Sequence, residues 1–74
     1  MEPNRTGMSQ EEWESISEDE RLARNVWATA KKELNVARRA WKRKSNSVTY
    51  RAYQEARQWE IDCGNTVGLI QFEH

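Results

Sequence analysis

The amino-acid sequence predicts an all-α fold, an antiparallel helical hairpin preceded by a short helix and followed by a partly apolar tail. Apolar side chains recur at alternating spacings of four and three residues over about residues 18–44, the heptad pattern of a helix that packs on another helix. A second apolar face follows over about residues 48–63, and Ser45-Asn46-Ser47 has the composition of a short connection. The 74 residues therefore form one small helical domain, residues 1–74.

The first helix is predicted by its start signals. Ser9 and Glu12 match a capping box, in which each side chain accepts a hydrogen bond from the other residue's backbone N–H. Met8 and Trp13 occupy the positions of a hydrophobic staple, which fixes the direction of the chain as it enters a helix. We expect a short acidic helix over about residues 9–16.

A second capping box marks the start of the long helix. It is formed by Ser17 and Glu20, and acidic residues follow Ser17 directly, where the helix dipole favours negative charge. Ile16 stands seven residues before Ala23, in phase with the apolar pattern of the long helix. A single uninterrupted helix over residues 9–44 is therefore the alternative to a break, and the break is favoured.

The long helix has more apolar surface than one partner helix covers. Its heptad seam consists of Ala23, Trp27, Ala30, Leu34, Ala37 and Trp41. At about 100° per residue, further apolar residues widen this seam on one flank only. They are Leu22, Val26, Val36 and Ala40. Small scaffolds without a disulfide or a metal generally need oligomerisation or a partner, so we expect the hairpin to be completed by self-association.

The second helix shows one main apolar face. This face consists of Val48, Ala52, Ala56, Trp59 and Cys63. Gly64-Asn65 has the composition of a helix C-terminus, which leaves residues 65–74 as a tail. Three alternatives stay open for this tail: it closes the apolar flank, adds an extended segment to another element, or remains mobile. At the other end, residues 1–8 contain the only proline and lack periodicity, which predicts a flexible leader.

Charge is strongly segregated along the chain although the net charge is zero. Residues 1–20 carry a net charge of −6, residues 21–57 carry +9 and residues 58–74 carry −3. Six bases gather around the predicted turn, and we call them the basic cluster: Arg38, Arg39, Lys42, Arg43, Lys44 and Arg51. Such a cluster suits an acidic patch on another protein or the phosphates of a nucleic acid. Part of it also suits the helix dipole without any partner.

A second candidate surface combines the acidic residues near the N-terminus with aromatic side chains expected to be exposed. Its residues are Glu11, Glu12, Trp13, Glu14, Tyr50 and Tyr53. Three interpretations of the acidic segment stay open: it folds back on the basic face of its own chain, it mimics a nucleic-acid backbone, or it is simply solvated. The seam tryptophans Trp27, Trp41 and Trp59 are expected to be buried in the hairpin or its oligomer, whereas Trp13 is the exception.

Catalytic and metal-binding chemistry has little support in the sequence. Cys63 and His74 are the only residues of their types, so neither an internal disulfide nor a metal site of ordinary ligand number is possible. Cys63 falls on the apolar face of its helix, and the carboxylates lie in a chain too short to offer a deep cleft. We expect no enzyme activity, cofactor or small-molecule substrate. No apolar run approaches the roughly 18 residues of a membrane span, and the single cysteine suits a reducing, cytoplasmic compartment.

These features favour a small protein-binding module that occupies a surface of a partner macromolecule. Its size and composition fit an inhibitor or adaptor of viral or mobile-element origin. The alternative is a hairpin that binds nucleic acid through the basic cluster. Against this alternative, the isoelectric point near 6.6 lies well below the values above 9 that are typical of nucleic-acid-binding domains.

Overall fold

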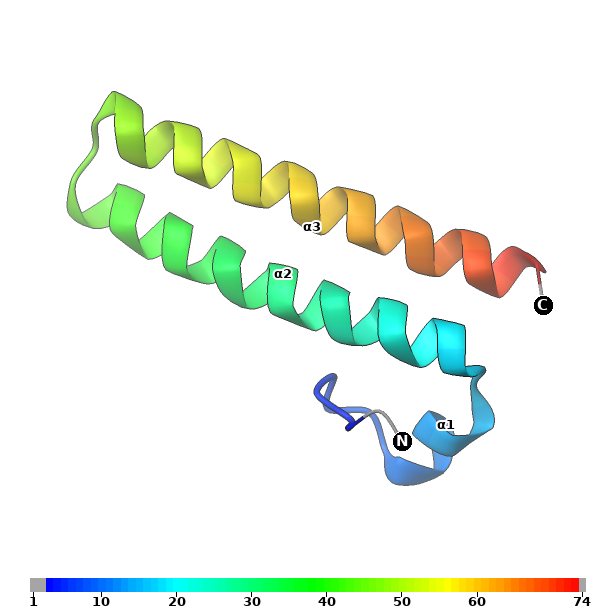
Figure 1. Cartoon of the computed structure of the whole chain (residues 1–74). Coiled ribbons are helices and arrows are strands. Elements are labelled where there is room, and N and C mark those ends of the chain that lie inside the picture. Colours follow the sequence, from blue (N-terminus) through cyan, green and yellow to red (C-terminus); the bar gives the residue numbers. More distant parts are fainter. Residues whose placement is uncertain (1–2, 74) are drawn as a thin grey trace.

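The computed structural model describes residues 3–73, and this part of the chain forms three helices (Figure 1). They are α1 (Gln10–Ser15), α2 (Glu18–Arg43) and α3 (Ser47–Glu73). The two long helices lie side by side and antiparallel, and α1 with the segment before it lies on the opposite side of α2 from α3 (Figure 1). The predicted all-α hairpin with a short first helix is confirmed.

Both predicted helix starts are present. The Ser9 hydroxyl accepts a hydrogen bond from the Glu12 N–H, and the Ser17 hydroxyl accepts one from the Glu20 N–H, each at 3.2 Å. Between the two helices, Ile16 has an extended backbone with φ −96° and ψ 159°. The chain therefore breaks between α1 and α2, and the alternative of one continuous helix is wrong.

The predicted end of the second helix at Cys63 is wrong, because α3 continues to its last described residue. Gly64 lies inside α3, where a Cβ atom would stand only 3.2 Å from Cζ2 of Trp27. The indole Nε1 of Trp27 donates a hydrogen bond to Oε1 of Glu60, one turn earlier on α3, at 2.9 Å. Gly64 therefore allows α2 and α3 to approach closely and does not terminate the helix.

The predicted tail is the last part of α3 as far as the structure describes it. Val67 is buried, so this segment contributes to the contact with α2, while Leu69 and Phe72 are exposed. The first alternative, closure of the apolar flank, does not hold: Ile70 lies beside Leu22 and Val26 in one groove, but both flank residues stay exposed. Met1, Glu2 and His74, which belong to the predicted leader and tail, lie outside the described residues.

The leader is held against α2 by hydrogen bonds over its described part. Oδ1 of Asn25 accepts from the Arg5 N–H at 3.1 Å, and Nδ2 of Asn25 donates to the Pro3 carbonyl at 2.7 Å. The Arg21 guanidinium donates to two successive carbonyls near the end of α1, the first of them that of Trp13, both at 2.8 Å. The leader and α1 thus form a third layer beside α2, and the described part of the predicted flexible leader is docked.

The buried residues all lie in one half of the hairpin. They are Trp13, Glu20, Asn25, Ala30, Cys63 and Val67. Between residues 31 and 62, every described side chain is at least partly exposed. We call residues 31–62 the turn half and the remainder, which includes the leader and α1, the open half. Fully buried side chains therefore occur only in the open half.

Candidate functional site

The basic cluster is held by a well-ordered turn between α2 and α3. The Asn46 side chain caps α3, because its Oδ1 accepts a hydrogen bond from the Thr49 N–H at 2.9 Å. The Thr49 hydroxyl donates back across the turn to the Lys44 carbonyl at 2.6 Å. These bonds fix the relative position of the end of α2 and the start of α3, and with it the position of the cations that both helices carry.

Three aromatic side chains pack just behind this turn. The ring of Trp41 stacks on Tyr53 with 5.4 Å between centroids and an angle of 19°, and it meets Tyr50 at 5.5 Å and 49°. Trp41 and Tyr53 are half-buried, whereas Tyr50 is exposed. The predicted exposed pair of tyrosines is therefore correct for Tyr50 only. Within the hairpin, the seam tryptophans Trp27 and Trp41 are half-buried and Trp59 is exposed, so burial of Trp59 in an oligomer stays a prediction.

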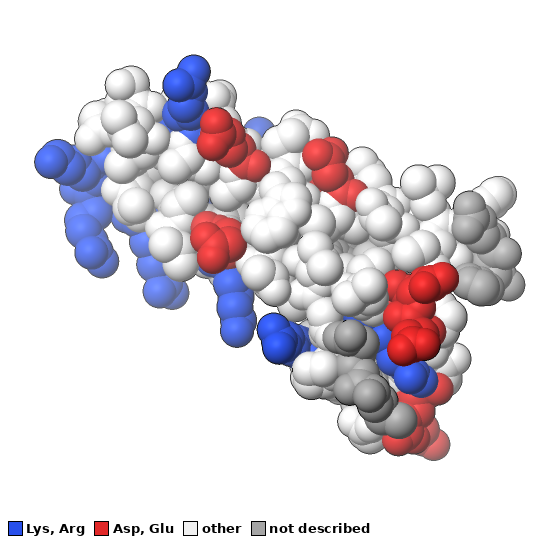
Figure 2. Space-filling model, in the orientation of Figure 1, with Lys and Arg blue, Asp and Glu red and all other residues white. Residues whose placement is uncertain are grey.

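All six side chains of the basic cluster are exposed. Within residues 3–72, the one ion pair joins Arg24 to Glu20 at 2.9 Å on α2, so no carboxylate in this range pairs with the cluster. Figure 2 shows Lys and Arg gathered over the turn and along α2, while Asp and Glu lie near α1 and in separate patches over the middle of the hairpin. The turn end of the molecule is therefore mainly positive and the end near α1 mainly negative.

The helix dipole accounts for only part of this cluster. Lys42 and Arg43 lie in the last turn of α2, where cations stabilise a helix. At the start of α3 the dipole favours acidic residues instead, and both α1 and α2 have them in their first turns. The first turn of α3 has no acidic residue, and the basic residue Arg51 follows this turn. The positive charge at this end therefore exceeds what helix stability favours.

The acidic segment lies at the other end of the molecule. Glu11, Glu12 and Glu14 are exposed on α1, but Trp13 between them is only 1% exposed. The predicted exposure of Trp13 is wrong, because α1 docks on α2 and turns this ring inward. The segment packs on the first half of α2, so it leaves the basic cluster uncovered.

The cysteine has the surroundings of an unreactive thiol. Burial, and then the neighbouring carboxylates of Asp62 and Glu60, raise the pKa of Cys63 above its ordinary value, which keeps the thiol protonated near neutral pH. His74, the other residue considered for catalysis, lies outside the described residues. Over residues 3–73, no three His, Cys, Asp or Glu side chains are grouped so as to hold a metal ion. No helix in this range is long and apolar enough to cross a bilayer.

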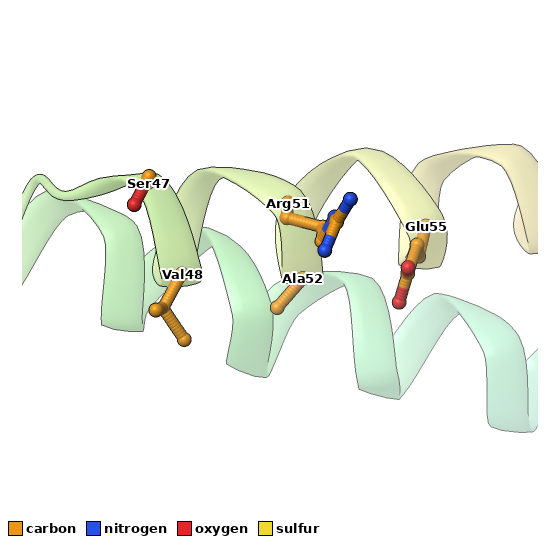
Figure 3. A pocket seen from close by; sticks show the side chains of 5 residues that line it. All are labelled: Ser47, Val48, Arg51, Ala52 and Glu55. Carbon is orange, nitrogen blue, oxygen red and sulfur yellow. The ribbon is translucent and has the colours of Figure 1, made fainter.

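A shallow groove of about 510 Å³ adjoins the basic cluster at the start of α3 (Figure 3). It is lined by Ser47, Val48, Arg51, Ala52 and Glu55. Sequence analysis assigned Arg51 to the cluster but missed this groove, which combines an exposed cation with the apolar side chain of Val48. The helical spacing of Val48, Ala52 and Glu55 was the available signal.

Comparison with known proteins gives no match for this chain, whether with protein-family models, curated proteins or solved structures. The function is therefore inferred from the charge and geometry of the described surface.

Proposed function

We propose that this chain is a non-enzymatic protein-binding module, of inhibitor or adaptor type, that binds an acidic surface of a partner protein. The observation that carries the proposal is the basic cluster: six exposed cations at one end of the hairpin, with no carboxylate within residues 3–72 paired to them. A fixed turn presents these cations, so little backbone ordering is needed when a complementary surface binds. The single cysteine supports action in a reducing, cytoplasmic compartment.

The packing of the aromatic residues favours a protein partner over a nucleic acid. Proteins that bind single strands stack bases on aromatic rings, but Trp41 is already stacked on Tyr53. The exposed acids on α1 add negative charge to the same small molecule and oppose the approach of a phosphate backbone. A nucleic-acid-binding hairpin remains the alternative, since the cations alone suit phosphates equally well.

The test compares two pairs of charge-removing substitutions. Arg39→Gln with Arg43→Gln removes two cations of the basic cluster, and Lys32→Gln with Arg57→Gln removes two exposed cations outside it. Each protein is used to capture partners from native cell extract, with and without nuclease, and is titrated with duplex DNA over a range of salt concentrations. We expect the first pair to weaken capture of a protein partner at least tenfold, the second pair to leave it unchanged, and nuclease to have no effect.

Duplex binding by the unmodified protein would support the alternative. Contacts with four phosphates give a log-log salt slope of about −3.6. A slope of this size, reduced to about −1.8 by the first pair and unchanged by the second, would contradict the protein-partner proposal. Equal capture by both variant pairs would also contradict it, because the position of the cations would then not matter.

A further inference from the structure

One broad face of the hairpin carries apolar side chains from the turn to the other end. At about 100° per residue, six side chains of α3 between residues 47 and 72 fall within a sector of roughly 60°. They are Val48, Ala52, Glu55, Trp59, Thr66 and Ile70. Leu22 and Val26 of α2 lie beside the last of these, because they line one apolar groove of about 320 Å³ together with Thr66 and Ile70. We call this surface, which runs through both the turn half and the open half, the open face.

The open face leaves large apolar side chains in contact with solvent. Val48 is 75% exposed, Trp59 is 40% exposed, and Leu22 and Val26 are also exposed. The leader reaches only the edge of this face, where Arg5 lines a groove with Leu22 and Val26, and both of these side chains stay exposed. The turn half, which contains Val48 and Trp59, has no buried residue of its own. Its core is therefore completed only when another surface covers this face.

We propose that a second copy of this chain covers the open face, with the two hairpins antiparallel and related by a two-fold axis. The molecule measures 43 × 22 × 15 Å. Two helices, each about 10 Å across, make a face about 20 Å wide along this 43 Å length, which is enough for the roughly 800 Å² per partner that a standard interface buries. The two-fold arrangement gives four packed long helices with apolar faces turned inward, a stable solution for amphipathic helices.

Charge complementarity sets the antiparallel orientation and favours a second copy as the occupant. At the turn end of the open face, Arg51 lies beside Val48, and at the other end Asp19 lies beside Leu22. A parallel copy places like charges together, whereas an antiparallel copy places Arg51 of each chain near Asp19 of the other. Glu55 also lines the turn-end groove, but it lies nearer the middle of the face.

The sequence positions on α3 agree with a two-fold axis near Trp59. Val48 lies eleven residues before Trp59, and Ile70 lies eleven residues after it. An axis at this point brings Val48 of one copy over Ile70 of the other, and it brings the two Trp59 rings to the centre of the interface. A two-fold interface must be complementary to itself in this way. Arg51 then serves the dimer, while the other cations of the basic cluster stay available to a partner.

Sedimentation equilibrium of the full chain at about 10⁻⁵ M tests the dimer with a matched pair of substitutions. Trp59 and Ile61 are both 40% exposed, but they project about 160° apart around α3. We expect the unmodified chain to be a dimer, Trp59→Gln to raise the dissociation constant at least tenfold, and Ile61→Gln to leave it unchanged. A monomeric unmodified chain, or equal effects of the two substitutions, would overturn the proposal.

Charge reversal tests the orientation. We expect Arg51→Glu and Asp19→Lys each to raise the dissociation constant severalfold, and the double variant to restore it, because the reversed pair is again complementary. Circular dichroism checks that each variant keeps its helical content. Failure of the double variant to restore association while helicity is retained would exclude the antiparallel pairing. Neither measurement requires a partner protein, so the binding proposal for the basic cluster stands or fails separately.

Discussion

The two halves of the hairpin are built from the same pair of helices, yet only one has a core. In the open half, the leader and α1 add a third layer that buries Trp13 against α2, and Val67 is buried on α3. In the turn half, two helices meet without a third element, and the stacked rings of Trp41 and Tyr53 stay half-buried. Two amphipathic helices therefore need a further layer before either can bury large side chains completely.

The polar residues differ between the halves in the same way. The open half buries Asn25 and Glu20, and each has its hydrogen-bond partners: Asn25 holds the leader, and Glu20 pairs with Arg24. The turn half keeps its many charges exposed, as the basic cluster shows. A buried polar group is costly without partners, so only a layer that supplies them permits such burial. Stability is thus concentrated in the open half and the candidate binding surface in the turn half.

The largest effect is expected from the tryptophan of the open half. Trp13→Ala should lower the free energy of unfolding by about 3–5 kcal/mol, the range for removal of a fully buried aromatic side chain. Trp41→Ala, in the turn half, should cost only about 2 kcal/mol, roughly half of that range, because this ring is half-buried. Urea denaturation at one fixed protein concentration measures both.

The decisive result is which of the two substitutions lowers the free energy of unfolding more. A cost for Trp41→Ala equal to or larger than that for Trp13→Ala would contradict the comparison of the halves. It would mean that the turn half contains the main core, as a tightly associated dimer could produce. Repeating the denaturation over a hundredfold range of protein concentration separates these cases, because only association makes the midpoint depend on concentration.

A smaller effect is expected from the side chain that holds the leader. Asn25→Ala removes the acceptor for the Arg5 N–H and the donor to the Pro3 carbonyl. It should lower the free energy of unfolding by about 1–2 kcal/mol, since both backbone groups can then bond to water. Asn65→Ala is the control, because Asn65 is exposed on α3 and gains the same helix propensity.

A second measurement follows the leader directly. Hydrogen exchange at the Arg5 amide should become faster in the Asn25→Ala variant and stay unchanged in the control. Loss of stability without faster exchange at Arg5 would show that Asn25 acts within α2 and does not hold the leader.

The helix starts could be predicted from the sequence because the signals are local. Ser9 and Ser17 each form the hydrogen bond that the capping-box pattern predicts, and both lie within three residues of their partners. The end of α3 could not be predicted in this way. Gly64 resembles a helix terminus, but its role depends on Trp27, which is 37 residues away in the sequence. Local propensity is a weak guide wherever a distant side chain decides the packing.

The candidate site was predictable in part for the same reason. The basic cluster follows from composition and from a predicted turn, and its side chains are exposed because nothing in the described chain covers them. For the second candidate surface, the predicted exposure of Trp13 was wrong, because the burial of this side chain depends on where α1 docks. The density and exposure of cations can be inferred from a single helix. The burial of an aromatic side chain can be predicted only when every layer around it is known.

The smallest effect is expected at two glycines of α3 and tests how tightly Trp27 packs. Gly68→Ala should raise the free energy of unfolding by about 0.5–1 kcal/mol, because a Cβ there meets nothing within 4 Å and alanine is the better helix former. Gly64→Ala gains the same propensity, but its Cβ stands 3.2 Å from the Trp27 ring. Overpacking of this kind costs about 1–3 kcal/mol, so Gly64→Ala should be less stable than Gly68→Ala by at least about 1 kcal/mol. Equal stabilisation by both substitutions would mean that the Trp27 ring moves aside freely. The close approach of α2 and α3 would then not explain why residue 64 is glycine.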